Sequence, residues 1–144
     1  MGIEPYLLTA SLSLVMAQRL VRRICEDCSA PWEPSKELLS RLKSFKPLDG
    51  STSASSWKFR RGTGCRRCGK SGYFGRIAIY EQFVISDTIK ALIADGAKLH
   101  EVKHLAQQEG LQTLLQSALN KVRDGVTTLD EAFSVCATQS ELLE

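Results

Sequence analysis

The sequence of 144 residues contains no apolar run long enough for a membrane span and no export signal at its start. Its longest uncharged apolar stretch, Pro5 to Gln18, is shorter than the roughly 20 residues that a membrane-spanning helix needs, and three Ser and Thr residues interrupt it. Glu4 stands where a signal peptide would carry Lys or Arg. We therefore expect a chain that neither crosses a membrane nor is secreted. Its 43% apolar and 24% charged residues exclude disordered, collagen-like and coiled-coil proteins.

Catalytic motifs are also missing. The sequence has no GxxxxGK[ST] phosphate-binding loop, no GxGxxG motif and no Ser, His and Asp in a context typical of a hydrolase. Residues 100–104 read HEVKH and match the HExxH pattern of zinc proteases. They hold the only two histidines of the chain, so a third zinc ligand would have to be a carboxylate such as Glu131. A helix that turns Leu99, Val102 and Leu105 inward leaves both histidines on its polar side, and we interpret the motif as a solvated helix face.

Cysteine, in contrast, is plentiful and paired. Four of the five cysteines form two knuckles of the same spacing, Cys25-Glu26-Asp27-Cys28 and Cys65-Arg66-Arg67-Cys68. A two-residue gap lets a tight turn aim two sulfurs at one ion, and Zn²⁺ prefers four such ligands in a tetrahedron. Because protein would fill all four positions, we expect one structural zinc ion. Two disulfides or a thioredoxin-like redox pair are the alternatives. The fifth cysteine, Cys136, falls on the apolar face of the last helix and is predicted to be buried.

The apolar spacing predicts the elements of the first half. Apolar residues three and four apart indicate one helix from Pro5 to Ile24, so apolar that it would pack into something larger. Proline and glycine interrupt residues 25–72, which we assign to the zinc module. Within this module a short helix, Lys36 to Phe45, would follow Ser35 as its N-cap. Asp49 to Ser56 is of low complexity and reads as an exposed loop.

The second half begins with a strand. Residues Arg76 to Ile85 are rich in Ile, Val, Tyr and Phe, which is typical of a strand. Four short amphipathic helices follow, and we expect them to form a bundle. The predicted fold class is α+β and mostly helical, with three parts: 1–24 as a terminal helix, 25–72 as the tetracysteine module with a short strand region, and 73–144 as a strand with a four-helix bundle.

Charge is unevenly distributed along the chain. Residues 1–80 hold fourteen Lys and Arg against six Asp and Glu, whereas residues 81–144 hold five against ten. Four thiolates on one Zn²⁺ would add −2 and lower the net charge from +3 to about +1, so no general attraction to nucleic acid follows. The basic residues gather around the second knuckle and could meet acidic lipid headgroups or an acidic partner, or form a solvated rim. They are Arg60, Arg61, Arg66, Arg67, Lys70 and Arg76.

Five segments carry further motifs. Residues 1–7 read MGIEPYL, residues 17–28 read AQRLVRRICEDC, and residues 62–81 read GTGCRRCGKSGYFGRIAIYE. Near the end, residues 109–114 read EGLQTL and residues 124–131 read DGVTTLDE. Together these motifs resemble the C-terminal part of the type II secretion and type IV pilus assembly ATPases, almost from end to end.

This resemblance implies a part of a hexameric ATPase motor for secretion or pilus assembly. A RecA-like ATPase domain would precede Met1, the helix at 1–24 would belong to it, and Cys25, Cys28, Cys65 and Cys68 would be the zinc ligands. ATP and Mg²⁺ would bind only in the parent protein, so this chain would not itself be an enzyme. It would contact the ATPase core, neighbouring subunits and the inner-membrane platform, in the bacterial cytoplasm at the inner membrane.

A stand-alone zinc ribbon that binds nucleic acid is the alternative function. It would use the same basic residues around the second knuckle. Only Tyr73 and Phe74 lie near them in the sequence as stacking partners for bases, and the second half of the chain is acidic, so nucleic acid is an unexpected partner.

Overall fold

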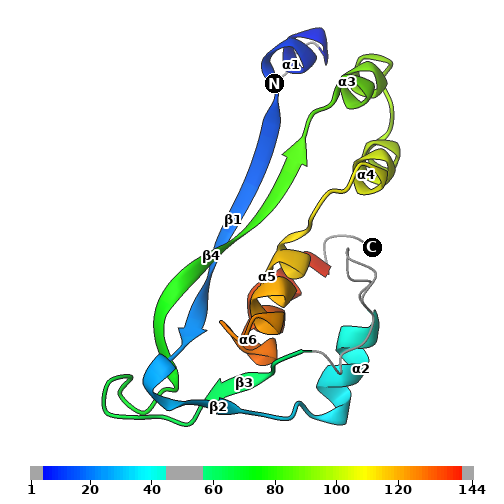
Figure 1. Cartoon of the computed structure of the whole chain (residues 1–144). Coiled ribbons are helices and arrows are strands. Elements are labelled where there is room, and N and C mark those ends of the chain that lie inside the picture. The colour runs from blue at the N-terminus through cyan, green and yellow to red at the C-terminus, as the bar shows by residue number, and fades with distance from the viewer. Residues whose placement is uncertain (1–4, 45–56, 141–144) are drawn as a thin grey trace. The chain divides into compact units, whose positions relative to one another are not determined.

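The computed structural model describes residues 5–44 and 57–140, which form helices and strands, as predicted (Figure 1). The helices of these residues are α1 (Pro5–Ser11), α2 (Lys36–Ser44), α3 (Asp87–Ala94), α4 (Leu99–Gln108), α5 (Leu114–Arg123) and α6 (Leu129–Ser140), with a short 3₁₀ helix, η1, at Glu26–Cys28. The strands are β1 (Leu14–Ile24), β2 (Ser29–Pro31), β3 (Arg60–Gly62) and β4 (Tyr73–Val84). None of the helices within the described ranges is both long enough and apolar enough to cross a membrane.

Two small sheets connect distant parts of the chain. β1 pairs with β4, and β2 pairs with β3. The second pair is antiparallel and sets Ser29 opposite Gly62 and Pro31 opposite Arg60. Since β2 directly follows the first cysteine knuckle and β3 comes shortly before the second, this pairing brings the two knuckles together.

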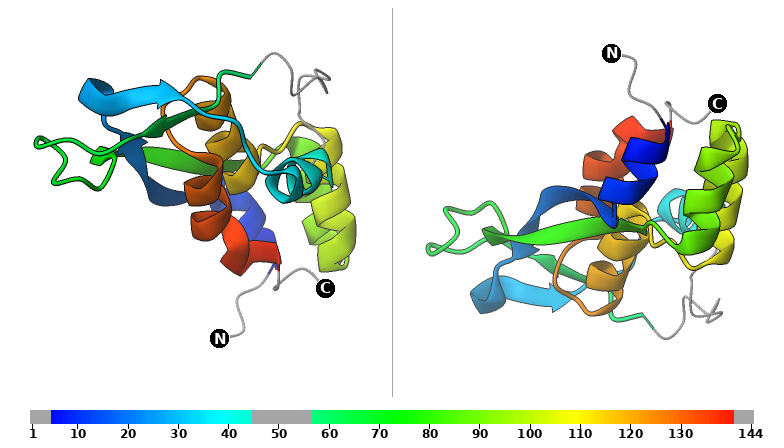
Figure 2. Two further views of the ribbon diagram at one scale, coloured as in Figure 1. Left: turned by 90° about the horizontal axis from the view of Figure 1, so that it is seen from below. Right: turned by 90° about the horizontal axis from the view of Figure 1, so that it is seen from above.

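The chain divides into two compact units. One comprises Met1–Ala17 and Tyr80–Thr113, and the other comprises Gln18–Ile79 and Leu114–Glu144. In the first unit α3 contacts both α1 and α4, and α3 and α4 lie side by side in both views of Figure 2. Its core holds Ile85, Ile89 and Ala106. The Ser86 side chain accepts the Ile89 N–H at 3.2 Å and so caps α3.

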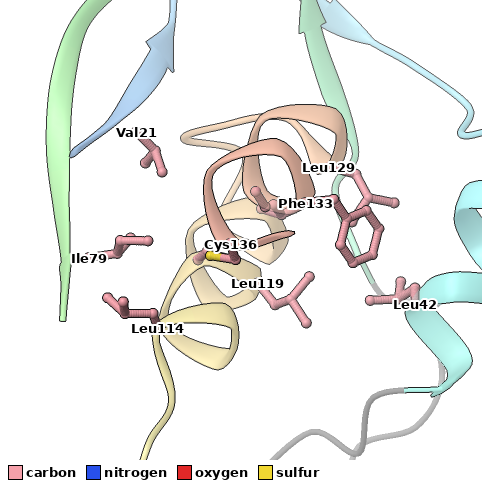
Figure 3. Packing of buried hydrophobic residues seen from close by; sticks show 11 residues of the cluster. Val21, Leu42, Ile79, Leu114, Leu119, Leu129, Phe133 and Cys136 are labelled. Carbon is pink, nitrogen blue, oxygen red and sulfur yellow. The ribbon is translucent and has the colours of Figure 1, made fainter. Parts of the chain in front are cut away.

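The larger core lies in the second unit. Here α5 and α6 pack together, and Val21 from β1, Ile79 from β4 and Leu42 from α2 pack against them (Figure 3). Cys136 is 5% exposed within this core, which confirms its predicted burial. Residues from both halves of the sequence therefore form one core around the helices that follow the zinc module.

The prediction of one helix from Pro5 to Ile24 is wrong beyond Ser11. The chain is helical only in α1 and continues as the strand β1. β1 carries apolar side chains on both faces: Val21 is fully buried, whereas Met16 and Leu20 are about half exposed. A strand of this kind lacks the alternation of apolar and polar residues that would distinguish it from a buried helix. The spacing of apolar residues alone therefore could not show whether this segment is a helix or a strand. Pairing with β4 determines the conformation.

The other elements follow the sequence more closely. α2 begins after Ser35, whose Oγ accepts the Leu38 N–H at 3.3 Å. β4 starts three residues before the predicted strand. All four helices of the second half are present, but α3 and α4 belong to one unit and α5 and α6 to the other, so a single four-helix bundle is not confirmed. The predicted loop at Asp49 to Ser56 lies outside the described residues.

Candidate metal centre

Backbone hydrogen bonds hold the two cysteine knuckles against each other. Cys25 directly follows β1 and donates its N–H to the Gly72 carbonyl at 2.9 Å. Thr63, just after β3, donates its N–H to the Cys28 carbonyl at 2.9 Å. Both cysteines of the first knuckle are thus tied to the segments on either side of the second knuckle. All four predicted cysteines lie in one cluster.

The sulfur atoms have the spacing of a tetrahedral metal site. All four Sγ atoms lie within 4.8 Å of one another. Separate pairs measure 3.7 Å (Cys25 and Cys65), 3.8 Å (Cys28 and Cys68) and 3.6 Å (Cys65 and Cys68). A zinc tetrahedron with Zn–S bonds of about 2.3 Å has edges of about 3.8 Å, whereas bonded sulfurs would lie about 2.05 Å apart. The cluster therefore fits a metal ion better than the disulfide alternative.

Backbone amides make the four sulfurs unequal. Cys65 and Gly72 donate their N–H groups to Cys68 Sγ at 3.1 and 3.3 Å. The Cys65 amide outweighs burial and lowers the pKa of the Cys68 thiol to about 6. Burial instead raises the pKa of the Cys28 thiol to about 11 and also raises that of Cys25. Such N–H donors to sulfur are typical of the surroundings of metal-bound thiolates.

Two glycines let the backbone pass close beside the cluster. A Cβ at Gly62 would lie 2.0 Å from the Gly72 carbonyl oxygen, and a Cβ at Gly72 would lie 2.5 Å from that of Gly62. Gly72 also has φ +78°. Because the Gly72 carbonyl accepts the Cys25 N–H and its amide donates to Cys68, this close approach positions both knuckles.

A substitution at Gly62 tests this close approach. We expect Gly62→Ala to force the two backbones apart and to lower the free energy of unfolding of the module by about 3 kcal/mol. Urea denaturation followed by circular dichroism measures the loss. Gly69→Ala is the matched control, because its added Cβ would meet no atom within 4 Å and only its φ of +57° opposes the change, at a cost of about 1 kcal/mol. Equal losses in the two variants would contradict the role given to Gly62.

A second group of polar side chains lies at the end of β1. Glu131 is 6% exposed. It accepts the Arg22 backbone N–H at 3.0 Å on Oε1, and Arg22 Nε and Nη2 at 2.9 and 2.6 Å on Oε2. Arg22 also lies 4.2 Å above the Tyr73 ring centre, and its carbonyl accepts the Thr127 hydroxyl at 2.8 Å. Burial alone would raise the pKa of Glu131, but its hydrogen bonds with Arg22 outweigh burial and hold this pKa below its ordinary 4.5.

The sequence indicated only one part of this arrangement. Thr128 and Glu131 have the sequence spacing of a capping box, and Thr128 Oγ1 accepts the Glu131 N–H at 3.2 Å. The partnership with Arg22 joins residues 109 positions apart and has no local signal. Glu131 therefore serves an ion pair rather than the protease-like site considered for it.

The HExxH residues form no metal site within the described ranges. His100, Glu101 and His104 are exposed on α4, and Glu101 Oε2 accepts the Lys98 N–H at 2.7 Å as a cap of that helix. Among the described residues, potential ligands gather in one group of three or more, the four cysteines. Leu99, expected to point inward, is 69% exposed, whereas Val102 and Leu105 pack against the first unit's core.

Half of the basic residues around the second knuckle are engaged within the protein. Arg60 donates to the Ser29 hydroxyl at 2.8 Å and to its carbonyl at 3.0 Å. Arg61 pairs with Asp130 at 3.8 Å, and Arg67 pairs with Asp27 at 2.9 Å. Three others are exposed and have no side-chain partner among the described residues: Arg66, Lys70 and Arg76.

The chain thus has mixed α and β structure and a cluster of four cysteines that could hold a metal ion. Comparison with known proteins identifies the family of the chain. The family model described as Type II/IV secretion system protein matches residues 1–134, and the chain belongs to this family. The resemblance found in the sequence motifs is thereby confirmed.

Named relatives agree with this family. The chain is 40% identical over 135 residues (93% of the chain) to a protein named type IV pilus assembly ATPase PilB from Thermus thermophilus. It is 42% identical over 131 residues (91%) to a protein of the same name from Myxococcus xanthus. It is 37% identical over 138 residues (94%) to type II secretion system ATPase E from Vibrio cholerae. The matches span 14%, 22% and 25% of these relatives' own lengths, respectively.

Proposed function

We propose that this chain is the non-catalytic C-terminal part of a hexameric ATPase motor for type II secretion or type IV pilus assembly, and that one structural zinc ion holds it together. The tetrahedral spacing of the four sulfurs is the observation that carries the proposal. Zn²⁺ suits this site because four thiolates are soft ligands and leave no position open for water. Bound zinc would stabilise the thiolate form of all four cysteines and join the two knuckles. Secretion or pilus assembly follows from the family.

The parts of the chain have separate roles in this proposal. Residues 1–24 belong with the ATPase core, 25–72 form the zinc module, and 73–144 supply a strand and helices that contact the core, a neighbouring subunit or the inner-membrane platform on its cytoplasmic side. ATP and Mg²⁺ bind elsewhere in the motor. Exposed apolar side chains on β1 support the first role, because Leu14, Met16 and Leu20 are 47%, 54% and 52% exposed and each could be buried by a packing partner.

A chimaera tests the function directly. The 131 matched residues of the Myxococcus xanthus relative would be replaced by the corresponding residues of this chain. We expect the chimaera to hydrolyse ATP and to assemble pili in cells that lack their own copy. The same chimaera with Cys28→Ser should lose zinc and assemble no pili. Pilus counts by electron microscopy, ATP hydrolysis and zinc content are the measurements.

The fifth cysteine provides the control for this experiment. Cys136→Ser makes the same chemical change at a buried cysteine that lies outside the cluster, so this chimaera should keep its zinc and its pili. A chimaera that folds and holds zinc but neither hydrolyses ATP nor assembles pili would contradict the proposed function.

A further inference from the structure

A cavity of about 230 Å³ lies beside the second cysteine knuckle, within the second unit. Its principal lining residues are Arg23, Glu26, Arg67, Phe74, Gly75 and Arg76. A water molecule takes about 30 Å³ in the liquid, and pockets for drug-sized ligands begin at about 300 Å³. The cavity therefore suits one small polar group with a few waters rather than a whole cofactor.

The charges of the lining favour an anion. Its lining residues include three arginines and one glutamate. Arg23 pairs with Glu26 at 3.0 Å, and Arg67 pairs with Asp27 at 2.9 Å. Arg76 has no side-chain partner among the described residues, so its five N–H donors are available. Planar guanidinium groups bind oxyanions through paired hydrogen bonds.

Two further features prepare this cavity for a ligand. The Arg67 Cζ atom lies 4.6 Å from the centre of the Phe74 ring, and this contact helps to hold the guanidinium group in place. Gly75 lies inside β4 with φ +78°, and an added Cβ there would meet no atom within 4 Å. No neighbouring group of the protein thus fills the space above Gly75. A glycine inside a strand often marks the close approach of a ligand.

We propose that this cavity binds the carboxylate side chain of an acidic segment on a protein partner. Arginine beside a half-exposed aromatic ring is typical of the central residues of protein interfaces. Glu26 and Asp27 at the same place would repel an extended polyanion such as a nucleic acid or an anionic lipid surface, but a single carboxylate can reach Arg76 past them. This proposal goes beyond the proposed motor function, because it states how a partner would be bound.

Binding of an acidic peptide tests the proposal. The probe is a peptide of alternating glutamate and glycine, added to the zinc-loaded full chain in about 0.15 M salt. Nuclear magnetic resonance follows the amide of Gly75 and the Nε groups of the three arginines. Arg76→Gln should weaken binding at least about tenfold, because it removes a charge-assisted hydrogen-bond donor. Glu26→Gln should strengthen binding severalfold, because it removes the carboxylate that competes for Arg23.

Arg66→Gln is the matched control. Arg66 has the same charge as Arg76 and lies in the second knuckle next to the lining residue Arg67, but Arg66 is not among the residues that line the cavity. Its replacement should change affinity less than about twofold, as expected for an exposed charge. Arg23→Gln is a second test if Arg76→Gln fails to fold. Equal weakening by the Arg66 and Arg76 variants would overturn the proposal, as would binding only to inorganic phosphate, anionic vesicles or single-stranded DNA. The zinc content of each variant is measured as well. A variant that keeps its zinc shows that any change in affinity does not come from loss of the zinc centre.

Discussion

Cys65→Ser is expected to remove the bound zinc ion and to unfold residues 25–72. Serine cannot replace the thiolate at about 2.3 Å from the ion, and three remaining ligands hold zinc more weakly. Structural zinc contributes roughly 10–16 kcal/mol of apparent binding free energy in small zinc domains, and this energy stabilises the fold. We expect one zinc ion per chain in the wild type by elemental analysis and less than a tenth of that in the variant.

Chelation of the wild-type chain should reproduce this effect. Removing zinc with a strong chelator should make residues 25–72 sensitive to proteases, while α5 and α6 keep part of their helical signal because their core contains no cysteine ligand. Cys136→Ser should match the untreated wild type in zinc content and protease resistance. A metal-free chain that resists proteases as well as the zinc-loaded chain would contradict a structural role for the metal.

The size of the closed loop explains why the effect should be large. Thirty-six residues separate Cys28 from Cys65, and the ion joins the two ends of this segment. Outside the cluster, the described part of the segment is held by the short pair β2 and β3 and by α2. Loss of the metal restores conformational freedom to this long segment, which is otherwise held by the strand pair and by the packing of Leu42 in the core of the second unit.

The sequence predicts the cysteine cluster well because its signal is local. Two residues between the cysteines of each knuckle suffice to indicate ligands, and the pairing of β2 with β3 then brings the knuckles together. β1 is the opposite case. Its apolar residues on both faces match a buried helix, and only its pairing with β4, about sixty residues later, makes it a strand.

Other parts of the fold and of the site depend on contacts between residues that are far apart in the sequence. The four C-terminal helices are individually predictable from their caps and apolar stripes, but their division between two units depends on which core each stripe meets. The cavity at Arg76 needs the second knuckle, the start of β4 and the end of β1 together. The basic cluster was visible in the sequence, whereas the engagement of Arg60, Arg61 and Arg67 was not.

The ion pair between Arg22 and Glu131 should be the strongest polar contribution to the second unit. We expect Arg22→Ala to lower the free energy of unfolding by about 3 kcal/mol at pH 7, because it leaves the buried Glu131 carboxylate without its cation. Glu131→Gln should cost about 2 kcal/mol, because the Arg22 side chain is 54% exposed and water can replace part of the lost contact. Urea denaturation measures both.

The neighbouring arginine provides the control. Arg23 pairs with Glu26 at 3.0 Å, but both side chains are largely exposed, at 45% and 77%. Arg23→Ala should therefore change stability by no more than about 0.5 kcal/mol. In the double variant Arg22→Ala with Glu131→Gln, the loss should be smaller than the sum of the single losses, because the second change removes the charge that the first leaves unpaired.

Acid should abolish the difference between wild type and Arg22→Ala. In the wild type the pKa of Glu131 is held below 4.5, so its contribution to stability is present above pH 4.5 and is lost as the pH falls through the lowered pKa. In Arg22→Ala the backbone N–H of residue 22 still donates to Glu131, but the side-chain hydrogen bonds and the positive charge are gone. Burial then raises this pKa relative to the wild type, so the variant gains relative stability as the carboxyl takes up a proton on acidification. The two unfolding free energies should converge below pH 4.5, and a gap that stays constant between pH 7 and pH 3 would show that Arg22 stabilises the unit through packing rather than through its charge.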